Sequence, residues 1–233
     1  MMQQLPLGIK LSDSASFSNY IPDANNRHLI EMIKATLQGN GGHYLYFWGA
    51  TGTGKSHLLQ GACHYLTQHG GNPIYLPLKT LSHYSADSLM GLETVDLLCL
   101  DDLQAVVGLQ EWERAIFHLF NALRDAHIPL LITANAAPKQ LDLQWPDLVS
   151  RLLWGGVFAL NHLEMDLAIQ ALQHHAQTRG LHLPAKIALF LLEKTQGELA
   201  QAIALLAQLD DAALSNKKAL TLPFVRQILN GNN

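Results

Sequence analysis

The sequence has few cysteines and no hydrophobic run long enough to cross a membrane. No stretch of its 233 residues reaches the roughly 18 consecutive apolar residues of a membrane helix. The first residues also lack the charged-then-apolar layout of a secretion signal. The two cysteines, Cys63 and Cys99, fall in predicted core elements, which favours reduced thiols over a disulfide or a metal site. We therefore expect a cytoplasmic protein with no membrane partner.

Positive charge is also scarce. The chain has 15 Lys and Arg against 19 Asp and Glu, a formal net charge of −4, and no basic block. This balance excludes a basic protein that coats nucleic acid by counterion release. The twelve histidines show no metal-binding spacing, since neither an H-E-x-x-H pattern nor a Cys/His cluster occurs, and no G-x-S-x-G hydrolase motif is present.

What the sequence does contain is a complete phosphate-binding loop. Residues 49–56 match the pattern G-x-x-x-x-G-K-[ST], in which glycines let successive N–H groups face a phosphate chain. The loop follows an apolar run at 43–48 that suits a buried strand, and residues 56–69 have helical spacing. Strand, loop and helix is the order that this chemistry requires. We expect the loop and the residue after it to bind a nucleotide through Gly49, Thr51, Gly52, Thr53, Gly54, Lys55, Ser56 and His57.

Strands and helices alternate through the first two-thirds of the chain. Further apolar runs predict strands, and a helical pattern fills residues 110–126 with a shorter helix near 147–152; the four runs lie at 72–76, 95–100, 129–133 and 156–160. Such a pattern predicts an α/β fold, a five-stranded parallel sheet flanked by helices, followed by a small all-α lid. The expected divisions are a flexible segment at 1–12, the α/β domain at 13–162 and the helical lid at 163–233.

Polar residues follow two of the predicted strands. Asp101 and Asp102 end one apolar run and Asn135 follows the next, so all three fall at the carboxyl edge of the sheet, where ligands gather. Asp101 with Ser56 could hold Mg²⁺, Asp102 could orient or deprotonate an attacking water, and Asn135 could contact the γ-phosphate or that water. Paired acids can also merely terminate a strand, and asparagine favours turns for local reasons.

Arg151 lies between the last predicted helix and strand of the α/β domain, distant in sequence from the phosphate-binding loop. It could be a solvated or helix-capping arginine. It could also be an arginine finger, a guanidinium offered to a nucleotide that another protein binds.

Over about residues 15–230, this set of motifs resembles the AAA+ superfamily and, within it, the bacterial replication initiator DnaA. The resemblance rests on the phosphate-binding loop and on four other segments, which lie at 16–26, 97–102, 150–155 and 220–225. It implies that Tyr20 and Ile21 line the base pocket and that Arg151 is the finger.

Two departures from the family bear on function. The sequence stops at Asn233, just after the lid, without the initiator's helix-turn-helix domain, so we expect no origin recognition. Ala200 occupies the position of a nucleotide-sensing arginine in the third lid helix. Alanine cannot contact a γ-phosphate, so we expect weak or no intrinsic ATPase activity and poor discrimination between ATP and ADP.

The first residues resemble the short glutamine-leucine peptide that docks on the DNA polymerase sliding clamp, although a frayed terminus would read similarly. The implied anchors are Gln4, Leu5, Leu7 and Ile9.

Together these features resemble a truncated relative of the initiator that regulates it. We expect a protein that binds a nucleotide with Mg²⁺, ADP rather than ATP. It would sit on the clamp, reach DNA only through it, and stimulate the initiator's ATPase. A homo-oligomer remains open, as do an autonomous P-loop ATPase such as a helicase loader and a nucleotide kinase.

Overall fold

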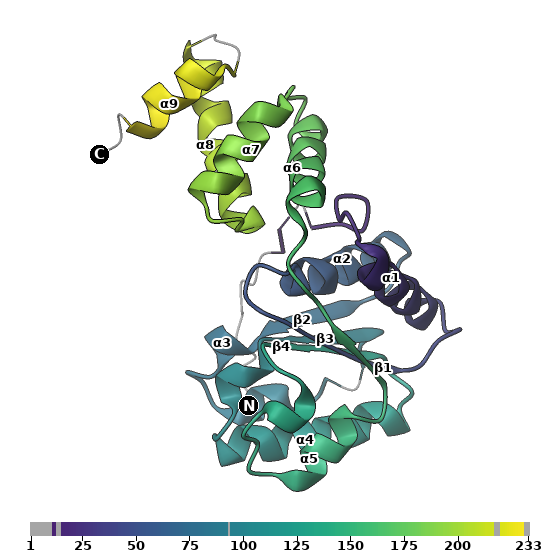
Figure 1. Ribbon diagram of the computed structural model, residues 1–233. Helices are drawn as coiled ribbons and strands as arrows, with labels where there is room; N and C mark the ends of the chain where they lie inside the picture. The colour runs from purple at the N-terminus through teal and green to yellow at the C-terminus, as the bar shows by residue number, and fades with distance from the viewer. Residues whose placement is uncertain (1–10, 13–14, 93, 217–219, 231–233) are drawn as a thin grey trace. The chain divides into compact units, whose positions relative to one another are not determined.

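The computed structural model describes residues 11–12, 15–92, 94–216 and 220–230, and the chain forms two compact units that divide between Asn161 and His162 (Figure 1). Within the described ranges, no helix combines the length and the apolar character needed to cross a bilayer.

The first unit is built on a five-stranded parallel sheet with the strand order β2-β3-β4-β1-β5. Strands β3 and β4, in the interior of the sheet, are buried along their whole length, whereas the edge strands β2 and β5 are partly exposed. The five strands are β1 (Tyr44–Trp48), β2 (Pro73–Pro77), β3 (Leu97–Asp101), β4 (Leu130–Ala134) and β5 (Gly156–Ala159). The fold class that the sequence predicts is confirmed.

Helices cover both faces of this sheet (Figure 1). One face packs on α1 (Ala24–Leu37) and α2 (Lys55–Gln68) through an apolar cluster. The other face carries α4 (Gln110–Asp125), α5 (Pro146–Leu152) and a second, larger cluster. Shorter turns complete the unit: α3 (Leu78–Leu81) and the 3₁₀ turns η1 (Ala86–Leu89), η2 (Leu103–Val106) and η3 (Pro138–Gln140).

The two cysteines meet inside the first of these clusters. Cys63 of α2 and Cys99 of β3 are buried and unbridged, with their sulfur atoms 3.6 Å apart. Burial and the neighbouring thiol raise the pKa of Cys99. Both side chains therefore serve as small apolar groups of the core.

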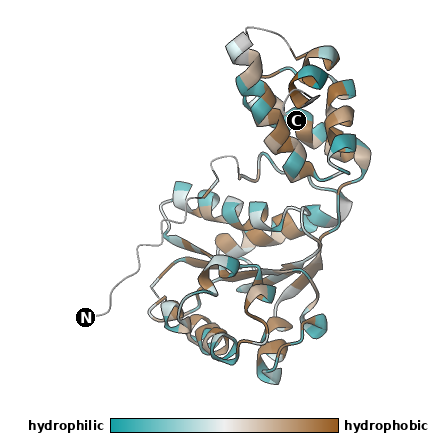
Figure 2. Ribbon diagram, turned by 90° about the vertical axis from the view of Figure 1, so that its left-hand side faces the viewer, coloured by the Kyte–Doolittle hydropathy of each residue, from teal (hydrophilic) through white to brown (hydrophobic). Residues whose placement is uncertain are grey.

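The second unit is entirely helical among its described residues. Its helices enclose a leucine-rich core of their own, to which Leu172, Leu191, Leu206 and Val225 contribute without any exposure. The helices are α6 (Met165–Thr178), α7 (Ala185–Lys194), α8 (Leu199–Asn216) and α9 (Leu222–Asn230). Figure 2 shows that these helices, like those of the first unit, carry hydrophobic and hydrophilic patches side by side. That pattern is expected of helices that bury one face.

Candidate functional site

The phosphate-binding loop joins the end of β1 to the start of α2. Gly52 and Gly54 have φ angles of 85° and 89°, in the left-handed region that favours glycine. Gly54 is the N-cap of α2 and offers no side chain to the N–H groups of the first helical turn. At Gly49 a Cβ atom would lie 2.2 Å from the backbone oxygen of Leu160. The glycines therefore permit a tight turn that leaves a helix N-terminus available to an anion.

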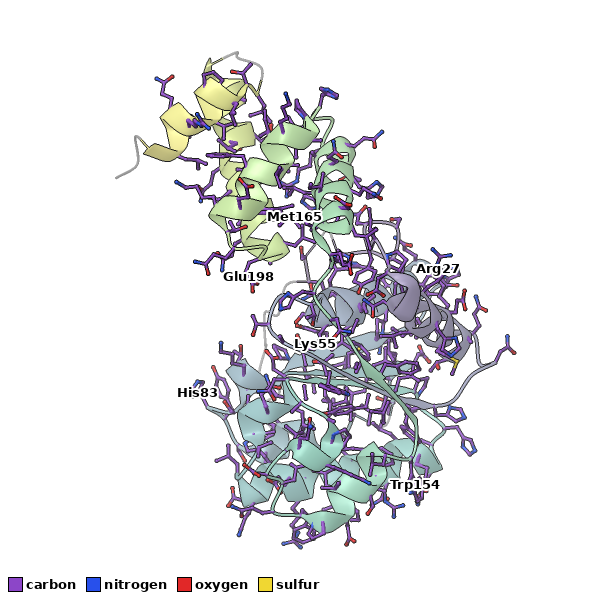
Figure 3. All side chains as sticks on the ribbon, viewed as in Figure 1. Arg27, Lys55, His83, Trp154, Met165 and Glu198 are labelled. Carbon is purple, nitrogen blue, oxygen red and sulfur yellow. The ribbon has the colours of Figure 1, made fainter. Side chains whose placement is uncertain are left out.

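Lys55 lies in the first turn of α2 (Figure 3) and is only 7% exposed. Its Nζ atom donates to the backbone oxygens of Gly49 and Ala50, both at 2.8 Å. Burial lowers the pKa of Lys55, and the charges of Asp102 and Asp101 partly oppose that shift. The structure thus brings the loop lysine and both predicted acids together. A phosphate oxygen would replace the loop carbonyls as the acceptor.

Asp101, at the end of β3, is held by two hydroxyl groups that the sequence analysis did not identify. Tyr75 of β2 donates to its Oδ2 atom at 2.6 Å, and Thr133 of β4 donates to its Oδ1 atom. Gln60 of α2 in turn donates to the Tyr75 hydroxyl at 3.3 Å. A carboxylate has about four lone-pair sites, so Asp101 retains capacity for a cation or its water shell.

Asp102 and Asn135 are connected through Gln104, a third residue without a predicted role. The Gln104 side chain donates to Asp102 Oδ1 at 2.9 Å and accepts from the backbone N–H of Asn135 at 3.1 Å. Asp102 has a φ of 61°, and its own N–H donates to the Thr133 hydroxyl at 3.0 Å. Asn135 is exposed just beyond β4. The two polar residues therefore share one scaffold at the carboxyl edge of the sheet.

Tyr20 packs against the start of α2. A Cβ atom on Gly54 would lie 2.8 Å from the Tyr20 ring, and the ring centroids of Tyr20 and His57 are 5.8 Å apart. The His57 ring N–H donates to the Ser16 oxygen at 2.9 Å, and burial lowers the pKa of His57, so the imidazole is neutral near pH 7. Tyr20 and His57 thus form a partly buried wall beside the loop, with Ile21 half-buried next in sequence.

Arg151 lies near the amino-terminal ends of the parallel strands, whereas the phosphate-binding loop lies at their carboxyl ends. This arginine lies in the last turn of α5 and lines a small pocket with Tyr44 and Gly155. Gly155 approaches Tyr44, the first residue of β1, so closely that a Cβ atom would lie 1.9 Å from the Tyr44 backbone oxygen. The phosphate-binding loop instead leaves the last residue of β1, and the two ends of this strand are roughly 13 Å apart. Arg151 is therefore poorly placed to reach the loop of its own chain.

The Arg151 guanidinium is half-buried and stacks on an aromatic surface. Its Cζ atom lies 4.1 Å from the ring centroid of Trp154 and 5.7 Å from that of Phe117. Across the described part of the chain, no carboxylate lies within ion-pair distance of it. The guanidinium thus keeps its positive charge uncompensated.

The two remaining predictions concern the clamp-docking residues and Ala200. The clamp-docking residues Gln4, Leu5, Leu7 and Ile9 lie outside the described residues, so their role stays a prediction. Ala200 lies in the first turn of α8, the third helix of the second unit, and is exposed.

Comparison with known proteins places this geometry in a family. Residues 11–159 match the model of the bacterial DnaA ATPase domain, and residues 165–229 match the model described as "Hda, lid domain". The chain belongs to the Hda/DnaA-like family of AAA+ proteins. The resemblance to DnaA that the sequence motifs indicate is thereby confirmed, and with it membership of a family of replication-initiation proteins.

Solved structures of this family share the fold. Domain III of DnaA from Thermotoga maritima is 22% identical, with a TM-score of 0.82 over 95% of this chain and 98% of that one. A replication initiator DnaA bound to AMPPCP and single-stranded DNA is 26% identical, with a TM-score of 0.68 over 84% of this chain and 66% of that one. AMPPCP-bound DnaA from Aquifex aeolicus is 24% identical, with a TM-score of 0.70 over 86% and 66%. The chain therefore spans about two-thirds of these two nucleotide-bound DnaA chains.

Proposed function

We propose that this protein is a nucleotide-bound regulator of replication initiation that stimulates ATP hydrolysis by the DnaA initiator. The observation that supports this proposal is the position of Arg151. Its uncompensated guanidinium lies at the opposite edge of the sheet from its own phosphate-binding loop. A cation in that position is suited to a triphosphate that another protein binds.

In this proposal the loop binds an adenine nucleotide, ADP rather than ATP. Gly49, Gly52 and Gly54 shape the turn. Lys55, whose Nζ atom lies against the loop carbonyls, would donate to the outer phosphate oxygens. Tyr20, Ile21 and His57 would flank the base. The Ser56 hydroxyl and Asp101 would hold Mg²⁺, which would neutralise phosphate charge. Ala200 carries no positive charge that could contact a γ-phosphate. This chain is therefore a poor ATPase by itself, even with Asp102 and Asn135 present.

Arg151 acts on the initiator's nucleotide. As the γ-phosphoryl group leaves, negative charge develops on its oxygens, and a guanidinium supplied from a second protein stabilises that charge. Such a finger is worth about 10³–10⁵ in rate in other phosphoryl-transfer systems. The initiator is left in its ADP form and does not restart replication.

The sliding clamp brings the two proteins together in this proposal. Gln4, Leu5, Leu7 and Ile9 dock on the clamp, which encircles DNA in the cytoplasm, so the protein reaches DNA indirectly. Tethering both partners near one clamp raises their effective concentration. A second copy of this chain is the other candidate recipient of Arg151.

The decisive experiment follows the ATP bound to the initiator after it is mixed with clamp-loaded DNA and this protein. We expect Arg151→Ala to reduce stimulated hydrolysis by about 10³-fold. Arg151→Lys should also fail, because a lysine cannot make the planar, two-pronged contact of a guanidinium. Nucleotide binding by both variants should match that of the wild type.

Arg114→Ala serves as the control, since Arg114 is an exposed arginine of α4 in the same unit. Full stimulation by Arg151→Ala would refute the finger. Rapid hydrolysis by the purified protein alone, lost on Lys55→Ala, would instead support an autonomous ATPase.

A further inference from the structure

The exposed indole of Trp154 contacts two arginine side chains on the surface next to α4 and α5. The Trp154 ring centroid lies 4.1 Å from the Cζ atom of Arg151 and 5.7 Å from that of Arg124. Trp154 is 56% exposed, whereas the other described Phe, Tyr and Trp side chains of this unit, apart from Tyr84, are buried or half-buried. In Figure 3 it lies across the sheet from Lys55, on the side of α4 and α5.

The two arginines differ in their charge compensation. Arg124 forms an ion pair with Asp125, with Nη2 and Oδ1 2.8 Å apart. The Arg151 guanidinium contacts the rings of Trp154 and Phe117, and none of the described carboxylates lies within 4 Å of it. The indole therefore contacts Arg124, whose charge Asp125 compensates, and Arg151, whose charge no described carboxylate compensates.

Trp154 is itself fixed by the core despite its exposure. Its backbone N–H donates to the Arg151 oxygen at 3.0 Å, and its ring meets that of Phe120 edge-on, with centroids 6.4 Å apart and planes at 80°. Phe120 is buried and stacks on Tyr44 of β1 with centroids 4.4 Å apart. A continuous aromatic column thus runs from the sheet to the guanidinium.

We propose that Trp154 is a positioning residue for Arg151, an inference that rests on the proposed function. A free arginine side chain samples many rotamers, and ordering it during the reaction would slow phosphoryl transfer. The indole face confines the guanidinium beforehand through a cation–π contact, which leaves its charge intact. A carboxylate in the same place would order the side chain equally well but cancel the charge that the transition state requires. The ring contact is weak enough to be exchanged for phosphate oxygens, which bind a guanidinium in pairs.

Kinetics of stimulated hydrolysis test this inference. With Trp154→Ala we expect the maximal rate to fall about two- to fivefold, the equivalent of one exposed cation–π contact. The concentration of this protein that gives half-maximal stimulation should stay the same. Trp154→Phe should recover most of the rate, because phenylalanine retains an aromatic face. Leu153→Ala is the control, since Leu153 is an exposed apolar neighbour without a ring.

Three kinetic results would overturn the inference: full activity of Trp154→Ala, equal loss in Trp154→Phe, or a change confined to the half-maximal concentration. The last result would mean that Trp154 only contacts the partner.

A spectroscopic arm separates this inference from the proposed function. The side-chain protons of Arg151 should show an upfield ring-current shift in the NMR spectrum of the wild type. That shift should vanish in Trp154→Ala, while the Arg114 signals stay unchanged. An unshifted Arg151 signal in the wild type would overturn the positioning role. A shifted signal in a protein that stimulates no hydrolysis would overturn the proposed function instead.

Discussion

Asp101 is a buried carboxylate whose two oxygens each accept a hydrogen bond from a hydroxyl group. Burial and the nearby Asp101 charge raise the pKa of Tyr75, so the Tyr75 hydroxyl stays protonated and remains a donor at any ordinary pH. A charge that is removed from water is stable only when it is compensated in this way. The residues that orient the carboxylate are therefore as important to the site as the acid itself.

We expect Tyr75→Phe to lower the free energy of unfolding by about 1.5–3 kcal/mol, because the variant removes a hydrogen bond to a buried charge. Urea denaturation at pH 7 measures this loss. Tyr65→Phe is the matched control, since the Tyr65 hydroxyl accepts from Gln38 at the surface at 3.0 Å. It should cost no more than about 0.5 kcal/mol. Equal costs for the two variants would contradict the argument.

At the residue scale, motif spacing predicted the acids but not their partners. Lys55 and Asp101 stand at positions that a pattern defines, and the structure brings them together as expected. Tyr75, Thr133 and Gln104 have no motif of their own. The strand register reveals Thr133, because Leu100 pairs with Ile132, which places Thr133 beside Asp101. Register depends on tertiary packing, so it could not be derived from one sequence.

The contact between the α5–β5 turn and β1 determines the position of Arg151 at the scale of elements. Gly155 lies directly against the Tyr44 backbone, and the register then pairs Gly156 with Leu45. No side chain fits between these two segments. The glycine therefore allows α5 to lie close to the amino edge of the sheet.

For Gly155→Ala we expect a loss of more than about 2 kcal/mol in stability, because the new Cβ atom would meet backbone that cannot move cheaply. Thermal denaturation followed by circular dichroism measures it. Gly42→Ala provides the comparison, since nothing lies within 4 Å of a Cβ atom there. That variant should be as stable as the wild type within about 0.5 kcal/mol. Unaltered stability of Gly155→Ala would show that the turn can shift.

The elements themselves could largely be predicted from the sequence. All five strands lie within two residues of the apolar runs, since buried parallel strands read as continuous hydrophobic segments. Helix α1 is not among the predicted elements. Its larger apolar residues begin only at Leu29, after a polar first turn, although Asp23 caps the helix by accepting from the Asn26 N–H at 2.6 Å. The order of the strands in the sheet had to come from the structure.

At the scale of the whole molecule, the proposed activity joins functions that lie in different parts of the chain. The phosphate-binding loop and Arg151 belong to the first unit, whereas Ala200 belongs to the second, which has its own core. The segment predicted to dock on the clamp precedes the described residues of the first unit. The loop, Arg151 and the predicted docking segment can be tested separately, because the proposal gives each of them a different binding partner.

Replacing both Gln4 and Leu5 with alanine should weaken binding to the sliding clamp about tenfold or more, because small apolar anchors carry most of the energy of such peptides. Co-elution with the clamp in gel filtration measures the change. Gln3→Ala, at the same terminus but outside the predicted peptide, should bind as the wild type does. Normal co-elution of the double variant would dismiss the docking role while leaving the Arg151 proposal untouched.

The cysteine pair gives the molecule a built-in reporter. Both thiols lie between α2 and the sheet, and the second unit contains no cysteine at all. An alkylating reagent can reach them only when the sheet unit opens, because a buried thiol is inert. The labelling rate of the natural protein therefore measures how often the first unit opens and does not depend on opening of the second unit. Addition of nucleotide should slow the labelling, and the labelling should slow more the more tightly the loop binds the nucleotide.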